Sequence, residues 1–283
     1  MTTSSRTALI TGANSGLGKA IALALAADGT QVGIVARDRT RGESALAEIQ
    51  ASTGNADLHL FIADLADQTS IRALAESVLA RFDRLHLLVN NAGTAYPARR
   101  LSPDGIECAL AVNHLAPFLL THLLLDRLTS SASARIVNVG TRINAAMDFE
   151  DLNWERRPYR MMQGYAQSKL GNLHFTFELA RRLHGSGVTV NAVFPGVFRS
   201  NLGGTDGAQG PFWKLVAALG GWAIPSPEQA ARRVLYLANA SELEGVSGQY
   251  FGNRKPLRAP AQARDPEANR RLWEISERLT GLS

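Results

Sequence analysis

The chain has 283 residues but only one cysteine, Cys108. A single cysteine excludes an internal disulfide and any zinc site built from several cysteines. Stability must therefore come from a hydrophobic core, and a chain of this length can bury one large core. We predict one domain that covers residues 1–283 and holds no metal.

The sequence also lacks an apolar run long enough to span a bilayer. The apolar run Leu115–Leu125 is interrupted by Pro117 and His122. Residues Met1–Arg6 are few and polar, unlike a signal peptide or an anchor. These absences predict a cytoplasmic protein that has no membrane partner.

Charge is modest, because the formal net charge is +5 and charged residues make up 19% of the chain. The basic residues are scattered, with small arginine pairs at 99–100, 156–157, 181–182 and 232–233. This distribution is typical of a solvated surface and argues against a nucleic-acid groove, although it suits an anionic cofactor. No internal repeat or low-complexity tract divides the chain.

Apolar, strand-like segments alternate with helix-like segments along most of the chain. The predicted strands are Thr7–Thr11, Gln31–Ala36, Leu58–Ile62, Leu85–Val89, Arg135–Val139, Val188–Phe194 and Gln249–Phe251. The predicted helices are Lys19–Ala27, Thr40–Ala51, Thr69–Phe82, Pro103–Leu128, Tyr165–Leu183, Pro227–Leu237 and Ala268–Leu279. This pattern favours an α/β fold with a doubly wound parallel sheet of the Rossmann type, covered on both faces. In such a sheet the ligand lies at the carboxyl ends of the strands.

Two long connections interrupt this alternation, at residues 143–164 and 197–224. Both carry large apolar side chains, and the second is rich in glycine. The apolar side chains either cap the sheet or wall an apolar substrate pocket, and the sequence leaves both interpretations open. We expect the second connection to be a mobile lid that closes over substrate. Residues 252–283 form a C-terminal tail whose docking the sequence does not define.

The stretch Thr7–Gly18 passes from a strand through a glycine-rich turn into a helix. Gly12 allows a tight turn, Gly16 lets a phosphate approach the backbone, and Gly18 lets the helix lie close to the sheet. The backbone N–H groups and the positive end of the helix suit a pyrophosphate. We therefore predict a dinucleotide site here.

The end of the second strand bears on the choice of cofactor. An acidic residue at that position would bond the ribose 2′-hydroxyl of NAD and repel a 2′-phosphate. Here the first charged residue is Arg37, whose guanidinium can pair with a 2′-phosphate. Asp38 follows it and either points to solvent or forms a salt bridge with Arg41. We predict NADP(H) as the cofactor.

Tyr165 and Lys169 lie four residues apart at the start of a predicted helix, which puts phenol and ammonium on one face. A free tyrosine has a pKa near ~10 and exchanges protons poorly at neutral pH. A nearby cation lowers the pKa of the phenol, so this pair can exchange a proton with a carbonyl or alcohol oxygen. A Tyr-x-x-x-Lys pair alone is common on helix surfaces, so its context must decide.

The order and spacing of these pieces resemble the short-chain dehydrogenase/reductase family over about Thr7–Phe251. The matching motifs are Thr11-Gly12-x-x-x-Gly16-x-Gly18, Asp64-Leu65, Asn90-Asn91-Ala92-Gly93, Asn113 within Val112-Asn113-His114, Tyr165-x-x-x-Lys169 and Pro195-Gly196. The long connection before Tyr165 and the stretch Pro195–Ser200 are similar to the retinol-dehydrogenase-like branch.

The resemblance implies a role for each matched residue. Tyr165 is implied as the general acid/base, Lys169 as the residue that lowers its pKa and binds the nicotinamide ribose, and Asn113 as the holder of a relay water. Together with Arg37, the implied cofactor-binding residues are Gly12, Asn14, Ser15, Gly16, Leu17, Gly18, Asp64, Leu65, Asn91, Ala92, Gly93, Tyr165, Lys169, Pro195, Gly196, Val197 and Ser200. Two structural alternatives stay open, Asp64 as a helix cap and Asn113 as a buried structural residue.

One residue departs from the family pattern. The family's catalytic serine follows the fifth strand, but here Val139 is followed by Gly140 and Thr141. Threonine keeps the hydroxyl and adds a methyl group, so Thr141 is expected to donate a hydrogen bond to the substrate oxygen. The alternative is that Thr141 only ends the strand.

These observations predict an NADP(H)-dependent oxidoreductase that transfers a hydride between nicotinamide and an apolar ketone, aldehyde or secondary alcohol, in the carbonyl-reducing direction. The main rival is a catalytically silent NADP(H)-binding sensor, against which the retention of Tyr165, Lys169 and Asn113 argues. A methyltransferase is disfavoured by the glycine spacing, and light-driven protochlorophyllide reduction by the single cysteine. The resemblance implies a monomer or a homodimer, because the helix Tyr165–Leu183 is the family's usual pairing surface.

Overall fold

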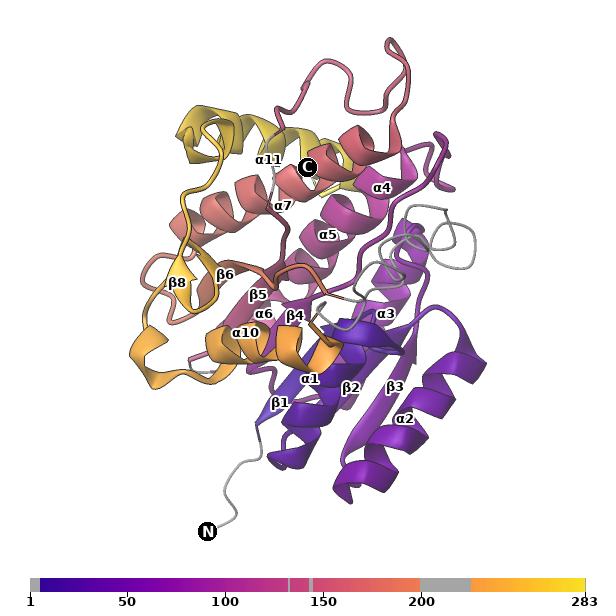
Figure 1. The fold of residues 1–283 in the computed structure, drawn as a ribbon, viewed down its shortest axis with the longest axis vertical. Coiled ribbons are helices and arrows are strands. Elements are labelled where there is room, and N and C mark those ends of the chain that lie inside the picture. The colour runs from indigo at the N-terminus through magenta and orange to yellow at the C-terminus, as the bar shows by residue number, and fades with distance from the viewer. Residues whose placement is uncertain (1–5, 132, 143–144, 199–224, 283) are drawn as a thin grey trace.

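An eight-stranded sheet runs through the part of the chain that the computed structural model describes, which is residues 6–131, 133–142, 145–198 and 225–282. The strands are β1 Thr7–Thr11, β2 Gln31–Ala36, β3 Leu58–Ile62, β4 Leu87–Asn90, β5 Arg135–Val139, β6 Thr189–Phe194, β7 Gln249–Gly252 and β8 Lys255–Pro256. Their order is β3-β2-β1-β4-β5-β6-β7-β8, and neighbours are parallel except for β7 and β8 (Figure 1). The predicted doubly wound α/β fold is confirmed.

Burial explains why the central strands are so apolar. β1 is buried along its whole length, and β2 and β5 are buried except at their first residues. The chain winds from β1 through β2 to β3 on one side, then returns to place β4 against the other side of β1. The chain after β1 leads to a helix on one face of the sheet and the chain after β4 to a helix on the other, and this reversal leaves a crevice at the carboxyl end of the sheet.

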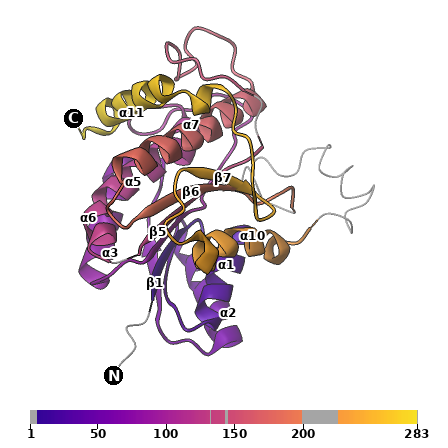
Figure 2. The ribbon, with the colours of Figure 1, turned by 90° about the vertical axis from the view of Figure 1, so that its left-hand side faces the viewer.

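Helices cover both faces of the sheet (Figure 2). One face carries α1 Gly16–Ala27, α2 Arg39–Thr53 and α10 Pro227–Asn239. The other face carries α3 Gln68–Arg81, α5 Ala116–Leu123, α7 Met161–Arg182 and, outside α7, α11 Pro266–Thr280. Each layer is closed by its own cluster of buried apolar side chains, such as Ile21 and Val234 on the first face and Leu74 and Phe118 on the second. Among the described residues, no helix has both the length and the apolar character needed to cross a membrane.

The predicted helical region Pro103–Leu128 is wrong at its start, and it is not one continuous α-helix. A bridge between Leu101 and Glu107 closes a loop there, and the Glu107 side chain caps the helix that begins at Cys108. The helical segments are α4 Cys108–Leu110, a π-helical turn Ala111–Leu115, then α5 and α6 Leu125–Thr129. A π-helical turn is rare and occurs frequently at functional sites.

The C-terminal tail is ordered by α11, which packs along the outer face of α7 (Figure 2). Trp273 on α11 is buried, and its ring lies 5.0 Å from the ring of Phe118 and 6.1 Å from that of Phe175, between centroids. The helix that the sequence marks as the family's pairing surface is therefore covered here by another part of the same chain.

Two buried histidines bind α11 to the rest of the domain. His114 Nε2 lies 2.8 Å from Ser276 Oγ, and His174 Nδ1 lies 2.5 Å from Asn269 Oδ1. Burial lowers the pKa of His114 to about 3 and that of His174 to about 4, so both rings are neutral near pH 7. Neutral rings can make these contacts without the cost of a buried charge.

The described part of the first long connection, residues 145–160, lies against α7. Met147 and Leu152 are buried in one cluster with Leu170 and Leu173 of α7, so these side chains cap the fold. Met162, at the beginning of α7, is 62% exposed instead and is free to contact another molecule. In the second connection the structure describes Val197 and Phe198, and the predicted lid at residues 199–224 lies outside the described residues.

Candidate active site

The predicted site residues gather where the parallel strands end. They are Gly12–Gly16 after β1, Arg37 after β2, Asp64 after β3, Asn91–Gly93 after β4, Gly140–Thr141 after β5 and Pro195–Val197 after β6. Parallel strands share one carboxyl edge, so six separate loops meet there although they span nearly two hundred positions of the chain. Ser200 lies outside the described residues.

The glycine-rich turn after β1 has the geometry that a phosphate needs. Gly12 has a φ of 64°, and Gly16 has a φ of 54° with open space where a Cβ would lie. Ser15 precedes α1 and makes no side-chain hydrogen bond to the first turn, so the N–H groups of that turn keep their capacity for an anion. A Cβ on Gly18 would collide with the carbonyl oxygen of Gly12, as the predicted close contact between helix and turn requires.

Asn91, which follows the neighbouring strand β4, stabilises the glycine-rich turn by hydrogen bonds. Its Nδ2 donates to the carbonyl oxygen of Thr11 at 2.8 Å, and its backbone N–H donates to Thr11 Oγ1 at 3.0 Å. The backbone N–H of Ala92 donates to the same hydroxyl at 3.0 Å. Asn91 therefore shapes the groove by holding the loops after β1 and β4 together.

Arg37 lies exposed at the carboxyl end of β2. The structure replaces both sequence alternatives for Asp38, because its Oδ1 accepts a hydrogen bond from the backbone N–H of Arg41 at 2.8 Å and so caps α2. The Asp38 carboxylate is therefore already used as the N-cap of α2. Arg37 is left as the nearest charge at the end of this strand.

Asp64 lies at the end of β3 beside Leu65, and it is exposed. Its Oδ1 accepts from the backbone N–H of Ala66 at 2.9 Å, while Asp67 is the residue that caps α3. The helix-cap alternative for Asp64 is therefore wrong, since its carboxylate only closes a short turn before the helix.

Asn113 lies at the centre of the π-helical turn and is fully buried. Its Oδ1 accepts from the backbone N–H of Thr94 at 2.7 Å, and its Nδ2 donates to the carbonyl oxygen of Thr94 at 2.8 Å and to Ser168 Oγ at 2.8 Å. Ser168 Oγ in turn donates to the carbonyl oxygen of Tyr165 at 2.8 Å. The Asn113 amide is thus a structural link between the loop after β4 and α7.

Lys169 is buried, with 3% of its surface exposed, and its Nζ donates to the carbonyl oxygen of Val139 at 3.1 Å. A Cβ on Gly93 would lie 2.9 Å from Nζ, so glycine is needed there for the ammonium to reach the groove. Burial lowers the pKa of Lys169 to about 8, because desolvation disfavours the charged form.

At the end of β5 the Thr141 side chain lies close enough to the Tyr165 phenol to influence its pKa. Thr141 is held through its carbonyl oxygen, which accepts from the Tyr250 hydroxyl at 2.9 Å. Burial raises the pKa of Tyr165 to about 12, and the neighbouring Thr141 side chain acts in the opposite direction. The expected net lowering of this pKa is wrong for this structure, because desolvation of the phenol dominates.

The loop after β6 begins with Pro195, Gly196 and Val197. Gly196 has a φ of 92°, and a Cβ there would collide with the guanidinium of Arg233 from α10. Val197 is 67% exposed. The sequence prediction included this loop but missed Arg233, which no motif marks and which only the packing of α10 brings near.

Thr94 and Ser168 were also missed by the sequence prediction. Ser168 lies directly before Lys169, so the Tyr-x-x-Ser-Lys spacing could have marked it. Thr94 acts through its backbone, which leaves no signal in residue type.

Comparison with known proteins agrees with this geometry. The family model for short chain dehydrogenases matches residues 6–209. Human retinol dehydrogenase 13 is 43% identical over 289 residues, covering 98% of this chain and 85% of the human protein. The structure of a short chain dehydrogenase from Burkholderia cenocepacia in complex with NADP has a TM-score of 0.69 and 29% identity, and the match covers 87% of this chain and 95% of that one.

A protein from Mycobacterium paratuberculosis has a TM-score of 0.79 and 33% identity, with 98% of this chain and 93% of the other covered. A fold and a site of this kind define an oxidoreductase built on a dinucleotide-binding sheet. The chain belongs to the short-chain dehydrogenase family and is an enzyme of its retinol-dehydrogenase-like branch.

Proposed function

We propose that this enzyme uses NADP(H) to reduce an apolar ketone or aldehyde to the alcohol, with Tyr165 as the proton donor. The observation that carries the proposal is that Tyr165 and Thr141 lie close together at the carboxyl edge of the sheet, on the side where Lys169 is buried. Two hydroxyl groups at one point can both bond a single substrate oxygen.

The groove fits a dinucleotide on the chain's own features. Gly12, Ser15 and Gly16 leave backbone N–H groups and open space at the start of α1, and Gly93 keeps the space beside the Lys169 ammonium clear. Asn14 and Ala92 lie in the same loops as these glycines, Leu17 lies in the first turn of α1, and Leu65 follows Asp64 in the loop after β3. When bound, the nicotinamide supplies the hydride that reduces the carbonyl carbon.

The protein's contribution is placement and proton transfer. A phenol whose pKa is about 12 stays protonated near neutral pH, so Tyr165 is ready to give its proton to a carbonyl oxygen that gains negative charge. Thr141 donates to the same oxygen. Lys169 is charged below a pH of about 8, and its ammonium stabilises the phenolate that Tyr165 becomes.

Asn113 contributes to the proposed proton transfer through its position in the π-helical turn. Its side chain is already occupied by Thr94 and Ser168, so a relay water would be held by backbone carbonyl groups of the turn. A π-helical turn skips a step of the helical hydrogen-bond ladder, which leaves a carbonyl group without its usual donor. The water would carry a proton from solvent toward Lys169.

The exposed Met161 and Met162 at the start of α7, together with Val197, offer apolar surface for the substrate at this edge. They favour an apolar carbonyl compound over a charged one. The oligomeric state, the cytoplasmic location and the lack of a membrane partner stay predictions from the sequence.

Purified protein tests the function by NADPH consumption over a panel of apolar aldehydes, ketones and quinones. Oxidation of NADPH that depends on one of these compounds, with formation of the matching alcohol, would support the proposal. Tight NADPH binding without turnover of any compound would instead indicate the sensor that the sequence left open.

Arg37 is expected to decide the cofactor preference. Arg37→Asp removes a charge-assisted partner of the 2′-phosphate and adds a repulsive charge, so NADPH affinity should fall by about 100-fold and NADH affinity should not. Cofactor titrations followed by fluorescence measure both constants. The matched control is Arg84→Asp, an equal change of charge at an exposed position before β4, at the opposite edge of the sheet. Equal affinities of the wild type for both cofactors, unchanged in Arg37→Asp, would refute the assignment.

Thr141 is expected to act through its hydroxyl alone. Thr141→Val keeps the shape of the side chain and removes the donor, so kcat should fall by about 10²-fold, the low end for one lost oxyanion donor. Thr141→Ser keeps the donor, so most activity should remain, and the lost methyl leaves room for bulkier substrates. Steady-state kinetics on one substrate compare the two variants. Wild-type turnover in Thr141→Val would mean that Thr141 only ends β5.

A further inference from the structure

The connection between β5 and α7 contains a cluster of side chains around the half-buried Arg157 that the catalytic scheme does not use. Arg157 lies with its guanidinium carbon 3.8 Å from the centre of the Trp154 ring, and its Nε lies 3.2 Å from Asp151 Oδ2. Trp154 is 4% exposed and has a φ of 57°, an uncommon conformation for a large side chain. Asp151 Oδ1 accepts from the backbone N–H of Glu155 at 2.6 Å, which closes the loop on itself.

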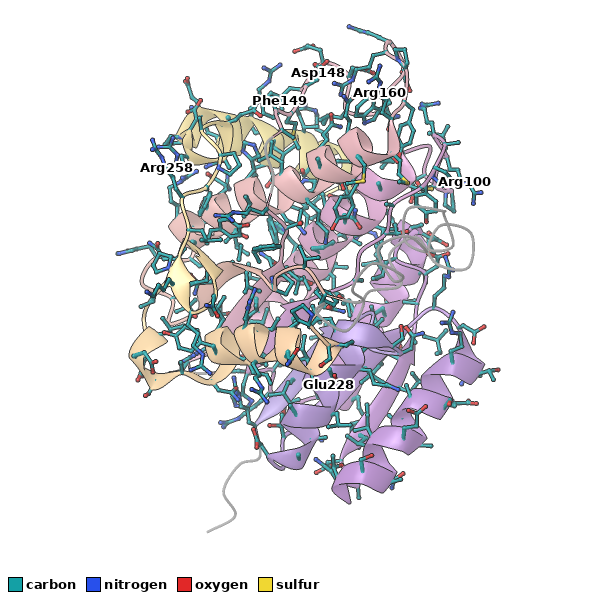
Figure 3. The ribbon with its side chains drawn as sticks, viewed as in Figure 1. Arg100, Asp148, Phe149, Arg160, Glu228 and Arg258 are labelled. Carbon is teal, nitrogen blue, oxygen red and sulfur yellow. The ribbon has the colours of Figure 1, made fainter. Side chains whose placement is uncertain are left out.

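This cluster is tied to α7 at one side chain, Gln167. Arg157 Nη2 donates to Gln167 Oε1 at 2.5 Å, and Gln167 Nε2 donates to the carbonyl oxygen of Leu152 at 3.0 Å. Gln167 is 2% exposed, so both halves of its amide are satisfied inside the protein by the connection. Figure 3 shows Asp148 and Phe149 on this connection, with Arg160 at its end where α7 begins.

Gln167 and the Tyr165–Lys169 pair lie on different faces of α7. Residues two apart on an α-helix point in directions about 200° different, and residues four apart differ by about 40°. Tyr165 and Lys169 therefore share the face toward the sheet, and Gln167 lies on the opposite face. The first turns of α7 are held from both sides, by the sheet edge through Lys169 and by the connection through Gln167.

A second contact between the connection and α7 lies just before Tyr165 in the sequence. A Cβ on Gly164 would lie 2.8 Å from the ring of Tyr159, so that ring packs directly on the helix backbone. The Tyr159 hydroxyl donates at 3.2 Å to Glu107, a fully buried carboxyl that caps α4. The connection thus fixes the helix just before and just after the tyrosine.

We propose that Arg157 and Gln167 are positioning residues, through which the connection sets the rotation and height of the first turns of α7 and so the place of the Tyr165 phenol. This inference rests on the proposed function. Misplacing a reacting group by about 1 Å can cost about 10²-fold in rate. Gln167→Leu is therefore expected to lower kcat by about 10- to 100-fold, with the KM for the carbonyl and the Kd for NADPH within about 2-fold of the wild type.

The test is a double-mutant cycle on the whole enzyme, with Arg157→Met, Gln167→Leu and the double variant. Because Arg157 acts through Gln167, the double variant should be no slower than Gln167→Leu alone. The matched control is Arg156→Met, which removes the neighbouring exposed arginine and should leave kcat unchanged. Arg157 is partly exposed, so Arg157→Met carries the test if Gln167→Leu does not fold. Independent, additive losses in the two single variants, or kcat within 2-fold of the wild type, would overturn the inference.

Amide hydrogen exchange gives a readout that does not need turnover. Residues 161–168 should exchange at least about 10-fold faster in Gln167→Leu and Arg157→Met, while α3 and the Arg156→Met control stay as in the wild type. Unchanged exchange at residues 161–168 would overturn the positioning role. Faster exchange there in a protein that reduces no carbonyl compound would support the role and overturn the proposed function instead.

Discussion

Tyr165→Phe is expected to reduce turnover by at least about 10³-fold, within the range for loss of a positioned acid or base. The change removes one hydroxyl group and keeps the ring, so packing around the first turns of α7 should survive. The lost group lies beside Thr141 and is the proposed proton donor to the substrate oxygen. Single-turnover NADPH oxidation at saturating substrate measures the chemical step directly.

NADPH binding provides the internal control for this variant. The Kd for NADPH should stay within about 2-fold of the wild type, because the groove is shaped by backbone groups and by Lys169. Undiminished turnover in Tyr165→Phe would remove the assigned mechanism, whichever compound proves to be the substrate.

Lys169→Met is expected to damage turnover and cofactor binding together. The ammonium is buried beside Gly93 and Val139, where it can serve both the nicotinamide ribose and the phenolate of Tyr165. We expect kcat to fall by about 10²- to 10³-fold, because stabilisation of the phenolate is lost, and the Kd for NADPH to rise by about 10-fold. Steady-state kinetics together with a fluorescence titration separate the two effects.

The pKa of Lys169 adds a stability readout for the same variant. Burial lowers this pKa from 10.5 to about 8 in the folded protein, so between pH 8 and 10.5 the unfolded chain binds more protons than the folded one. This difference makes wild-type stability rise with pH in that window, and the contribution should disappear in Lys169→Met. The difference in unfolding midpoint between the two proteins at pH 8 and pH 10 measures it. A constant difference, or unimpaired NADPH binding, would contradict the assigned role.

The sequence predicted the elements best where a buried strand is a continuous apolar run. β1, β2 and β5 have the predicted bounds, because strands buried on both faces admit little else. The edge strand β3 also has its predicted bounds, although it is only partly buried. The helical region from Pro103 failed because a backbone bridge between Leu101 and Glu107 replaces the first turn. Neither such a bridge nor the π-helical turn that follows it can be predicted from the residue types.

The candidate site was predicted as a set of residues and less well as a set of contacts. Spacing marked Tyr165, Lys169 and Asn113, because each follows a recognisable motif. The pKa of Tyr165 was predicted in the wrong direction, since a sequence shows the neighbouring cation and does not show the loss of water around a phenol. Gln167 and Arg157 stayed hidden because their role depends on how an irregular connection folds back onto a helix.

The docking of α11 on α7 also has a consequence for the order in which the domain is expected to fold. The contact between His114 and Ser276 closes 162 residues of chain, and the one between His174 and Asn269 closes 95. We expect such distant contacts to form late, since the entropy of closing a long loop must be overcome before any contact offsets it. Until α11 arrives, Phe118 and Phe175 remain open to water on the outer face of the catalytic helix layer. We therefore expect the docking of α11 to be the step that removes this apolar surface from water and with it a risk of aggregation.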